Sequence, residues 1–242
     1  MIYAFLKKNE EYSVNSEMLK KAVGYKAASF IESGMIVGLG TGSTAKYFIE
    51  KLIERQKTEN LRIQTVASST RSLQQAKKGG LPILDINTLN SIDITVDGAD
   101  EIDDEKRMIK GGGGALLREK IVASMSKELI IIIDESKKSS LLGHKKLPIE
   151  VVPFASQATL YKIHKLGWTA YFRKESEDST KNYITDNGNY IIDINFANPL
   201  EHPEKEHAIL KDIPGVVETG FFFHLAGRVI TSYQDGQVIV TP

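Results

Sequence analysis

The stretch from Met35 to Ala45 has the sequence MIVGLGTGSTA, and it indicates the fold class. Its first half, Met35 to Gly40, is an apolar run with the length and composition of a buried strand. The second half is rich in glycine, serine and threonine and leads into Thr44 to Arg55, where apolar residues recur at helical spacing. A short apolar strand, a tight turn and a helix form the repeating unit of parallel sheets that are covered on both faces.

The same alternation continues on both sides of this stretch. Helical spacing of apolar residues from Met18 to Ile31 predicts a preceding helix that ends at Gly34. Further strands are predicted over Arg62 to Ala67, Ile92 to Val96 and Leu129 to Asp134, with helices before Gly79-Gly80 and over Gly114 to Lys127. We therefore expect a doubly wound α/β domain.

The pattern changes near Lys145. A strand is predicted over Ile149 to Phe154 and a helix over Gln157 to Leu166. Two hairpins are then predicted, one pairing Tyr183–Thr185 with Tyr190–Ile194 and one pairing Arg228–Tyr233 with Val238–Thr241. We expect a smaller α+β unit to begin after about residue 145.

The composition excludes several classes of function. The 242 residues carry 31 basic and 31 acidic side chains, so no net field favours nucleic acid or an anionic membrane as a partner. There is no cysteine, which removes disulfides, thiol nucleophiles and thiolate metal sites. No apolar run is as long as a membrane span, and the apolar patch Ile2 to Leu6 precedes its lysines, unlike a secretory signal. We expect a soluble, cytoplasmic protein.

Gly38 to Ala45 passes from a strand into a helix and is a candidate anion site. Glycines let the backbone approach a ligand closely, and a helix N-terminus offers unpaired N–H groups. No lysine precedes Ser43, which argues against an ATP-binding P-loop, and no acidic residue ends the next predicted strand, which argues against a dinucleotide. The motif is either a tight turn alone or, as we favour, a site for a single phosphate at Thr41 to Thr44.

Asp97 to Glu105, with the sequence DGADEIDDE, follows the third predicted strand. Ligands of open α/β sheets bind at the carboxyl ends of strands, so Asp97 and Asp100 are candidate functional residues. A metal site is the alternative, but the run lacks EF-hand spacing and has no histidine nearby. We interpret Asp103 to Glu105 as a solvated charge run.

Lys110 to Lys120 has the sequence KGGGGALLREK. Four consecutive glycines are costly as a mere linker and suit a loop whose amides surround a ligand. At helical spacing Glu119 shares a face with Ala115, Val122 and Ala123, which predicts a partly desolvated carboxylate with a raised pKa, suited to a general base. The alternative is a surface glutamate between two basic residues.

The remaining polar and aromatic candidates are predicted to be structural. The five histidines form no metal-ligand pattern, and we expect His202 and His207 to face solvent. Trp168 is predicted to pack. The sequence therefore predicts neither a metal nor an organic cofactor.

Together these segments closely resemble the ribose-5-phosphate isomerase family of the A type. The resemblance runs in order through Lys20–Gly24, Gly38–Ala45, Asp97–Asp103, Lys110–Lys120, Ile133–Lys137, Leu147–Pro153, Thr185–Asn189 and Ile213–Val217. It implies a Rossmann-like domain, residues 1–145 plus 223–242, with an inserted ferredoxin-like α+β domain, residues 146–222. It also implies a homodimer or homotetramer. Residues 175–182, 195–206 and 222–228 follow the family poorly.

The resemblance implies interconversion of ribose 5-phosphate and ribulose 5-phosphate through a cis-enediolate, in the non-oxidative pentose phosphate pathway. It implies that Glu119 is the catalytic base and that Asp97, Asp100 and Lys110 are catalytic. The implied substrate contacts are Thr41, Gly42, Ser43, Thr44, Gly98, Ala99, Gly111, Gly112, Gly113, Lys137 and Lys20. Two alternatives stay open, an amino-sugar phosphate deaminase–isomerase and a sugar-phosphate sensor without catalysis.

Overall fold

The computed structural model describes residues 15–176 and 178–242, so the apolar patch Ile2 to Leu6 lies outside the described residues. In chain order the elements are α1 (Ser16–Ala28), β1 (Ile36–Leu39), α2 (Ala45–Thr58), β2 (Gln64–Ala67), α3 (Thr70–Gly79), η1 (Ile86–Thr88), β3 (Ile92–Gly98), β4 (Glu101–Ile102), β5 (Met108–Ile109), α4 (Leu116–Ser124), β6 (Ser126–Asp134), η2 (Glu135–Lys137), β7 (Leu147–Val151), α5 (Ser156–Lys165), β8 (Thr169–Phe172), β9 (Tyr190–Asn195), α6 (Pro203–Lys211), β10 (Val216–Thr219), β11 (Phe221–Phe222), β12 (Ala226–Ser232) and β13 (Val238–Thr241).

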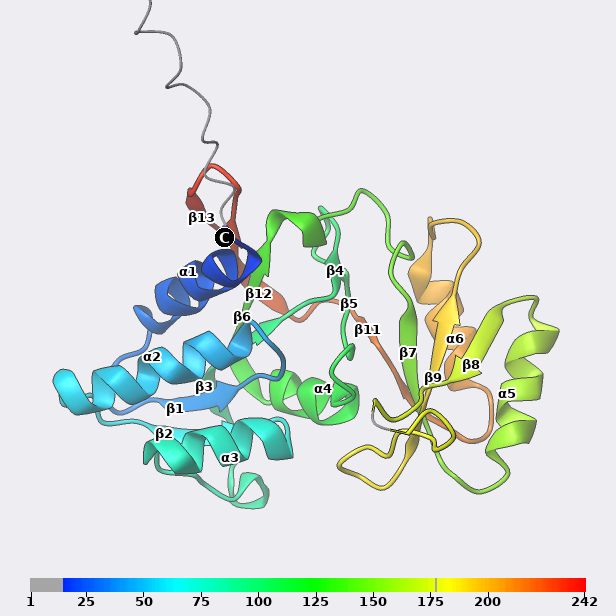
Figure 1. The fold of residues 1–242 in the computed structure, drawn as a ribbon, viewed down its shortest axis with the longest axis horizontal. Coiled ribbons are helices and arrows are strands. Elements are labelled where there is room, and N and C mark those ends of the chain that lie inside the picture. Colours follow the sequence, from blue (N-terminus) through cyan, green and yellow to red (C-terminus); the bar gives the residue numbers. More distant parts are fainter. Residues whose placement is uncertain (1–14, 177) are drawn as a thin grey trace, which may run out of the picture.

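A six-stranded sheet with the order β13-β12-β6-β3-β1-β2 forms the larger part of the molecule (Figure 1). All its pairings are parallel except that of β13 with β12. Successive residues of β6 point to opposite faces of the six-stranded sheet. Ile130 and Ile132 pack in a core with residues of α1 and α2, whereas Leu129, Ile131 and Ile133 pack in a second core with Ala123 of α4. The predicted Rossmann-like α/β architecture is confirmed.

A four-stranded antiparallel sheet, β10-β7-β9-β8, forms the smaller part, with α5 and α6 beside it (Figure 1). Its core includes Ile163 of α5 and Leu210 of α6. A third, small sheet, β11-β5-β4, lies between the two larger ones. After β11 the chain returns to the first sheet, where β12 pairs with β6.

Two secondary-structure predictions need correction. The predicted hairpin between Tyr183–Thr185 and β9 is reduced to a single bridge at Ile184 and Tyr190, because β9 is flanked by β7 and β8 instead. The predicted helix over Gly114 to Lys127 ends at Ser124, because the chain from Ser126 pairs with β3. The hairpin of β12 and β13 is confirmed.

Two side chains that were predicted to face solvent do not: Asp103 is buried and His207 is half-buried. Asp103 is 6% exposed because its carboxylate accepts a 2.7 Å hydrogen bond from Nε of Arg107, while Asp104 and Glu105 are exposed as predicted. His207 is half-buried, and its Nδ1 lies 2.8 Å from Oγ1 of Thr219. His202 is exposed. In the described part of the chain, no helix is long and apolar enough to cross a bilayer.

Candidate active site

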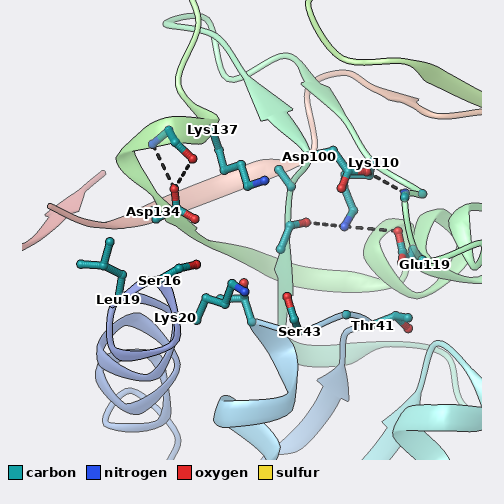
Figure 2. A pocket seen from close by; sticks show the side chains of 18 of the residues that line it. Ser16, Leu19, Lys20, Thr41, Ser43, Asp100, Lys110, Glu119, Asp134 and Lys137 are labelled. Atoms are coloured by element: carbon teal, nitrogen blue, oxygen red, sulfur yellow. Dashed lines mark hydrogen bonds and ion pairs between the residues drawn. The ribbon is translucent and has the colours of Figure 1, made fainter. Parts of the chain in front are cut away.

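The carboxyl ends of β1, β3 and β6 open onto a cavity of about 460 Å³. Three loops that follow these strands supply much of its lining, and the glycine loop before α4 closes one side (Figure 2). Figure 2 shows Lys20 and Lys137 toward one end of the cavity and Glu119 toward the other. The position agrees with the general rule for ligand sites in open α/β sheets.

The loop after β1 is held against Asp97 by a close backbone approach. A Cβ on Gly40 would lie 2.3 Å from Oδ1 of Asp97, so only glycine fits there. Oδ1 accepts hydrogen bonds from the backbone N–H of Thr41 at 2.9 Å and of Gly98 at 2.8 Å. The loop then enters α2 at Ala45, so residues 42–44 bring the positive end of a helix to the cavity.

Lys110 lies at the centre of a buried charge cluster. Its Nζ is 2.8 Å from Oδ2 of Asp97 and 3.3 Å from Oε2 of Glu119. Burial lowers the pKa of Lys110, but the two carboxylates outweigh burial and raise it above the ordinary lysine value. Lys110 is therefore a permanent cation that holds two carboxylates on opposite sides of its ammonium group.

Glu119 is the buried base that the helical pattern predicts. It is 3% exposed and shares the buried face of α4 with Val122 and Ala123. Burial raises its pKa to about 8; Lys110 opposes this shift, and the negative charges of Asp97 and Asp100 add to it. Among the described residues, Oε2 of Glu119 has no hydrogen-bond partner of good geometry. A carboxylate in this environment is a far stronger base than one in water.

The glycine loop is held by Asp100 from the cavity side. The backbone N–H of Gly112 donates a 2.7 Å hydrogen bond to Oδ2 of Asp100, and a Cβ on Gly112 would lie 2.6 Å from Oδ1. Gly111 and Gly114 have positive φ angles of 100° and 81°, which side chains rarely allow. These constraints explain why the loop contains consecutive glycines.

The structure brings the predicted site residues together, and all of them except Asp97 line the cavity. The cavity is lined by Lys20, Thr41, Gly42, Ser43, Thr44, Gly98, Ala99, Asp100, Lys110, Gly111, Gly112, Gly113, Glu119 and Lys137. Asp97 does not line it, because this side chain is 1% exposed and lies behind Lys110 and the Thr41 amide.

Several lining residues were not predicted: Ser16, Leu19, Arg71, Asp134, Ser136 and Gln234. Asp134 ends an apolar strand, as Asp97 does, and that signal was available in the sequence. Gln234 follows β12 and comes near the cavity because β12 pairs with β6, which no local pattern predicts. No group of three or more acidic or histidine side chains suited to a metal occurs among the residues that the structure describes.

The cavity combines the parts needed for proton transfer on a small anion. Lys20, Lys137, Lys110 and Arg71 supply cations that can bind an anion, and the carboxylates of Asp100, Glu119 and Asp134 line the same cavity. The α2 N-terminus can bind a phosphate, and the glycine-loop amides can stabilise an oxyanion. Glu119 can move a proton. The fold and site define a Rossmann-like α/β enzyme for acid–base chemistry on a small phosphorylated substrate.

Comparisons with known proteins identify the family. The family model for ribose 5-phosphate isomerase A (phosphoriboisomerase A) matches residues 64–236. Ribose-5-phosphate isomerase A of Protochlamydia amoebophila is 50% identical over 90% of this chain and 92% of its own length. Ribose 5-phosphate isomerase from Plasmodium falciparum has a TM-score of 0.89 at 38% identity, covering 93% of this chain and 98% of its own.

A D-ribose-5-phosphate isomerase solved in complex with phospho-erythronic acid has a TM-score of 0.89 at 37% identity. This match covers 94% of the present chain and 99% of that structure's chain. The chain belongs to the ribose 5-phosphate isomerase A family. The resemblance stated from the sequence motifs is thereby confirmed.

Proposed function

We propose that the protein interconverts ribose 5-phosphate and ribulose 5-phosphate, as an aldose–ketose isomerase. Family membership supports the reaction. The observation that carries the mechanism is the buried Glu119 carboxylate, 3.3 Å from the Lys110 ammonium, in the cavity onto which the α2 N-terminus opens. Isomerisation moves a proton between C2 and C1 of the open-chain sugar, which requires one base that faces both carbons.

In the proposed mechanism Glu119 removes the C2 proton of ribose 5-phosphate, the hydroxyl proton moves from O2 to O1 of the cis-enediolate, and Glu119 then returns its proton to C1. Negative charge develops on the substrate oxygens between these steps. Lys110 and the Gly113 amide line the cavity and are the donors that stabilise this charge, since the Gly112 amide already donates to Asp100. The phosphate binds at Thr41 to Thr44, with Lys20 and Lys137, and holds the reacting carbons near Glu119.

The two aspartates have different places in this proposal. Asp100 lines the cavity and is the aspartate that we place against the substrate hydroxyls, where it assists ring opening. Asp97 acts from behind, because its carboxylate binds both the Lys110 ammonium and the Thr41 amide. Gly98 and Ala99 form the wall between them. The chain's own residues carry each step, and the mechanism uses no metal or organic cofactor.

We also propose the wider setting that the family resemblance implies. The protein would act as a homodimer or homotetramer in the cytoplasm, in the non-oxidative pentose phosphate pathway. Its domains would be residues 1–145 plus 223–242 and residues 146–222. The return of β12 to the first sheet supports this division. Light scattering on the purified protein would measure the oligomer.

The direct test measures ribulose 5-phosphate formation from ribose 5-phosphate by protein treated with EDTA. We expect full turnover after chelation. Activity that is lost on chelation and regained with added metal would contradict the mechanism. Absence of pentose phosphate turnover, with turnover of an amino-sugar phosphate or with binding alone, would instead favour one of the two alternatives to the proposed function.

A further inference from the structure

Arg173 connects the smaller sheet to the glycine loop of the active site. It follows β8, and its side chain is 11% exposed. In the neighbouring strand β9, Ile192 and Ile194 pack in the core beside α5 and α6. Asp193 lies between them in sequence and points to the other face, where it is fully buried and binds Arg173.

The guanidinium group of Arg173 has two different sets of partners. Its Nε and Nη2 donate to the two carboxylate oxygens of Asp193, with Nε at 3.0 Å. Its Nη1 donates to the backbone oxygens of Gly111 at 3.0 Å and Gly112 at 3.1 Å. The Asp193 carboxylate thus fixes the orientation of the planar guanidinium group. The remaining nitrogen, Nη1, binds the carbonyl oxygens of two consecutive residues of the loop.

These bonds determine which way the loop amides point. In a trans peptide the N–H is directed opposite to the C=O. The Gly111–Gly112 peptide demonstrates this, because Arg173 holds its carbonyl while its N–H donates to Asp100 on the cavity side. By the same geometry, the bond from Arg173 to Gly112 O turns the Gly113 N–H away from Arg173.

The Gly113 N–H is left available by the protein itself. Gly113 lines the cavity, and its N–H has no hydrogen-bond partner among the residues that the structure describes. A cation on the carbonyl of a peptide also polarises that peptide and makes its N–H a stronger donor. The Gly113 N–H is therefore both oriented and strengthened from outside the cavity.

We propose that Arg173 is a positioning residue for catalysis. Anchored by Asp193, it orients the Gly112–Gly113 peptide so that its N–H serves as a donor to the oxyanion of the reacting sugar. The smaller sheet thereby takes part in the reaction without touching substrate. This inference rests on the proposed function, and its experiment includes a binding measurement that does not require turnover.

The test compares Arg173→Lys with Lys146→Met. Lys146 Nζ also binds Asp193, at 2.7 Å, but no bond from it to the glycine loop occurs in the described chain, so it is a matched control. A lysine at 173 keeps a positive charge near Asp193 but lacks the planar guanidinium group that binds both the Asp193 carboxylate and the loop carbonyls. We expect Arg173→Lys to lower kcat about tenfold with little change in KM, and Lys146→Met to keep kcat within about twofold, since losing an oriented donor affects the transition state.

A second measurement uses calorimetric binding of phospho-erythronic acid and of inorganic phosphate. Phospho-erythronic acid has a carboxylate that we expect to lie where the oxyanion forms, whereas inorganic phosphate has only the group that we expect to bind the loop after β1. In Arg173→Lys we expect binding of the acid to weaken about tenfold while phosphate binding stays within about twofold of wild type. This difference would support the inference even if the wild-type protein lacked turnover, in which case only the proposed function would fail.

Arg173→Ala provides a further check through chemical rescue. Guanidinium ion, at concentrations far below those that unfold proteins, should restore part of the lost kcat, whereas sodium ion at equal ionic strength should not. If Arg173→Ala does not fold, the lysine variant carries the test. Near-native kcat and acid binding in Arg173→Lys would overturn the inference, as would equal losses of kcat in Arg173→Lys and Lys146→Met.

Discussion

Replacing Glu119 with glutamine should decrease turnover and increase stability at the same time. Glutamine keeps the shape of the protonated side chain but cannot ionise or accept the C2 proton. Removing a general base typically reduces rate by about 10²- to 10⁴-fold. Because Lys110 keeps its bond to Asp97 and the phosphate loop is untouched, substrate binding should change little.

The gain in stability follows from the raised pKa of Glu119. Its ordinary value is 4.5 and burial raises the pKa to about 8 in the folded protein. Between these values the folded state retains a proton that the unfolded state has lost, so stability falls as pH rises through this window. Each pH unit costs about 1.4 kcal/mol, and pH 7 lies 2.5 units above 4.5, so wild type loses about 3 kcal/mol by pH 7.

Urea unfolding of wild type and Glu119→Gln at several pH values measures this cost. The variant should match wild type near pH 4 and exceed it by about 3 kcal/mol at pH 7, with a larger difference at pH 8. Turnover of ribose 5-phosphate is measured on the same samples. A variant that is less stable than wild type at pH 8 would refute the burial argument, and one with near-native turnover would refute the assignment of the base.

Three further predictions concern Glu119, Lys110 and Gly40. The kcat/KM of the wild type should rise with pH around a midpoint near 8, because the base must lose its proton; a profile that falls between pH 7 and 9 would contradict this. Lys110→Met should lower the unfolding free energy by about 3–5 kcal/mol at neutral pH, since it leaves the buried Asp97 carboxylate without a counter-charge; unchanged urea unfolding would show that the pairing is dispensable. Gly40→Ala should cost about 1–3 kcal/mol, because its Cβ would lie 2.5 Å from the backbone oxygen of Val96. Gly98→Ala is the control, with its nearest neighbour at 3.7 Å; equal melting temperatures of the two variants would disprove the steric argument.

The fold class and the glycine-rich segments could be predicted because their causes are local. A strand such as β6, which is apolar on both faces, must be covered on both sides, and its sequence shows this directly. The helical spacing around Glu119 also predicted its buried face correctly. The glycines at positions 40, 111 and 112 indicate from the sequence alone that the backbone there approaches other atoms closely. In the structure a Cβ at each of these positions would collide with a neighbouring atom.

Contacts that form only in the folded chain decided the rest. Asp97 and Asp100 are equivalent in the sequence pattern, yet one is sealed behind Lys110 and the other faces the cavity. Asp103 was predicted to be solvated, and Arg107 buries it. Arg173 is 62 residues from Gly111 and has no motif of its own.

The sequence by itself determined the layers of the fold and the two glycine segments, since periodicity and backbone freedom are properties of short stretches of chain. Only the tertiary structure decided how far the pKa of Glu119 rises, the separate places of the two aspartates and the contact of Arg173 with the loop. Burial and electrostatic interaction depend on distances through space, and the packing of one sheet against another sets those distances.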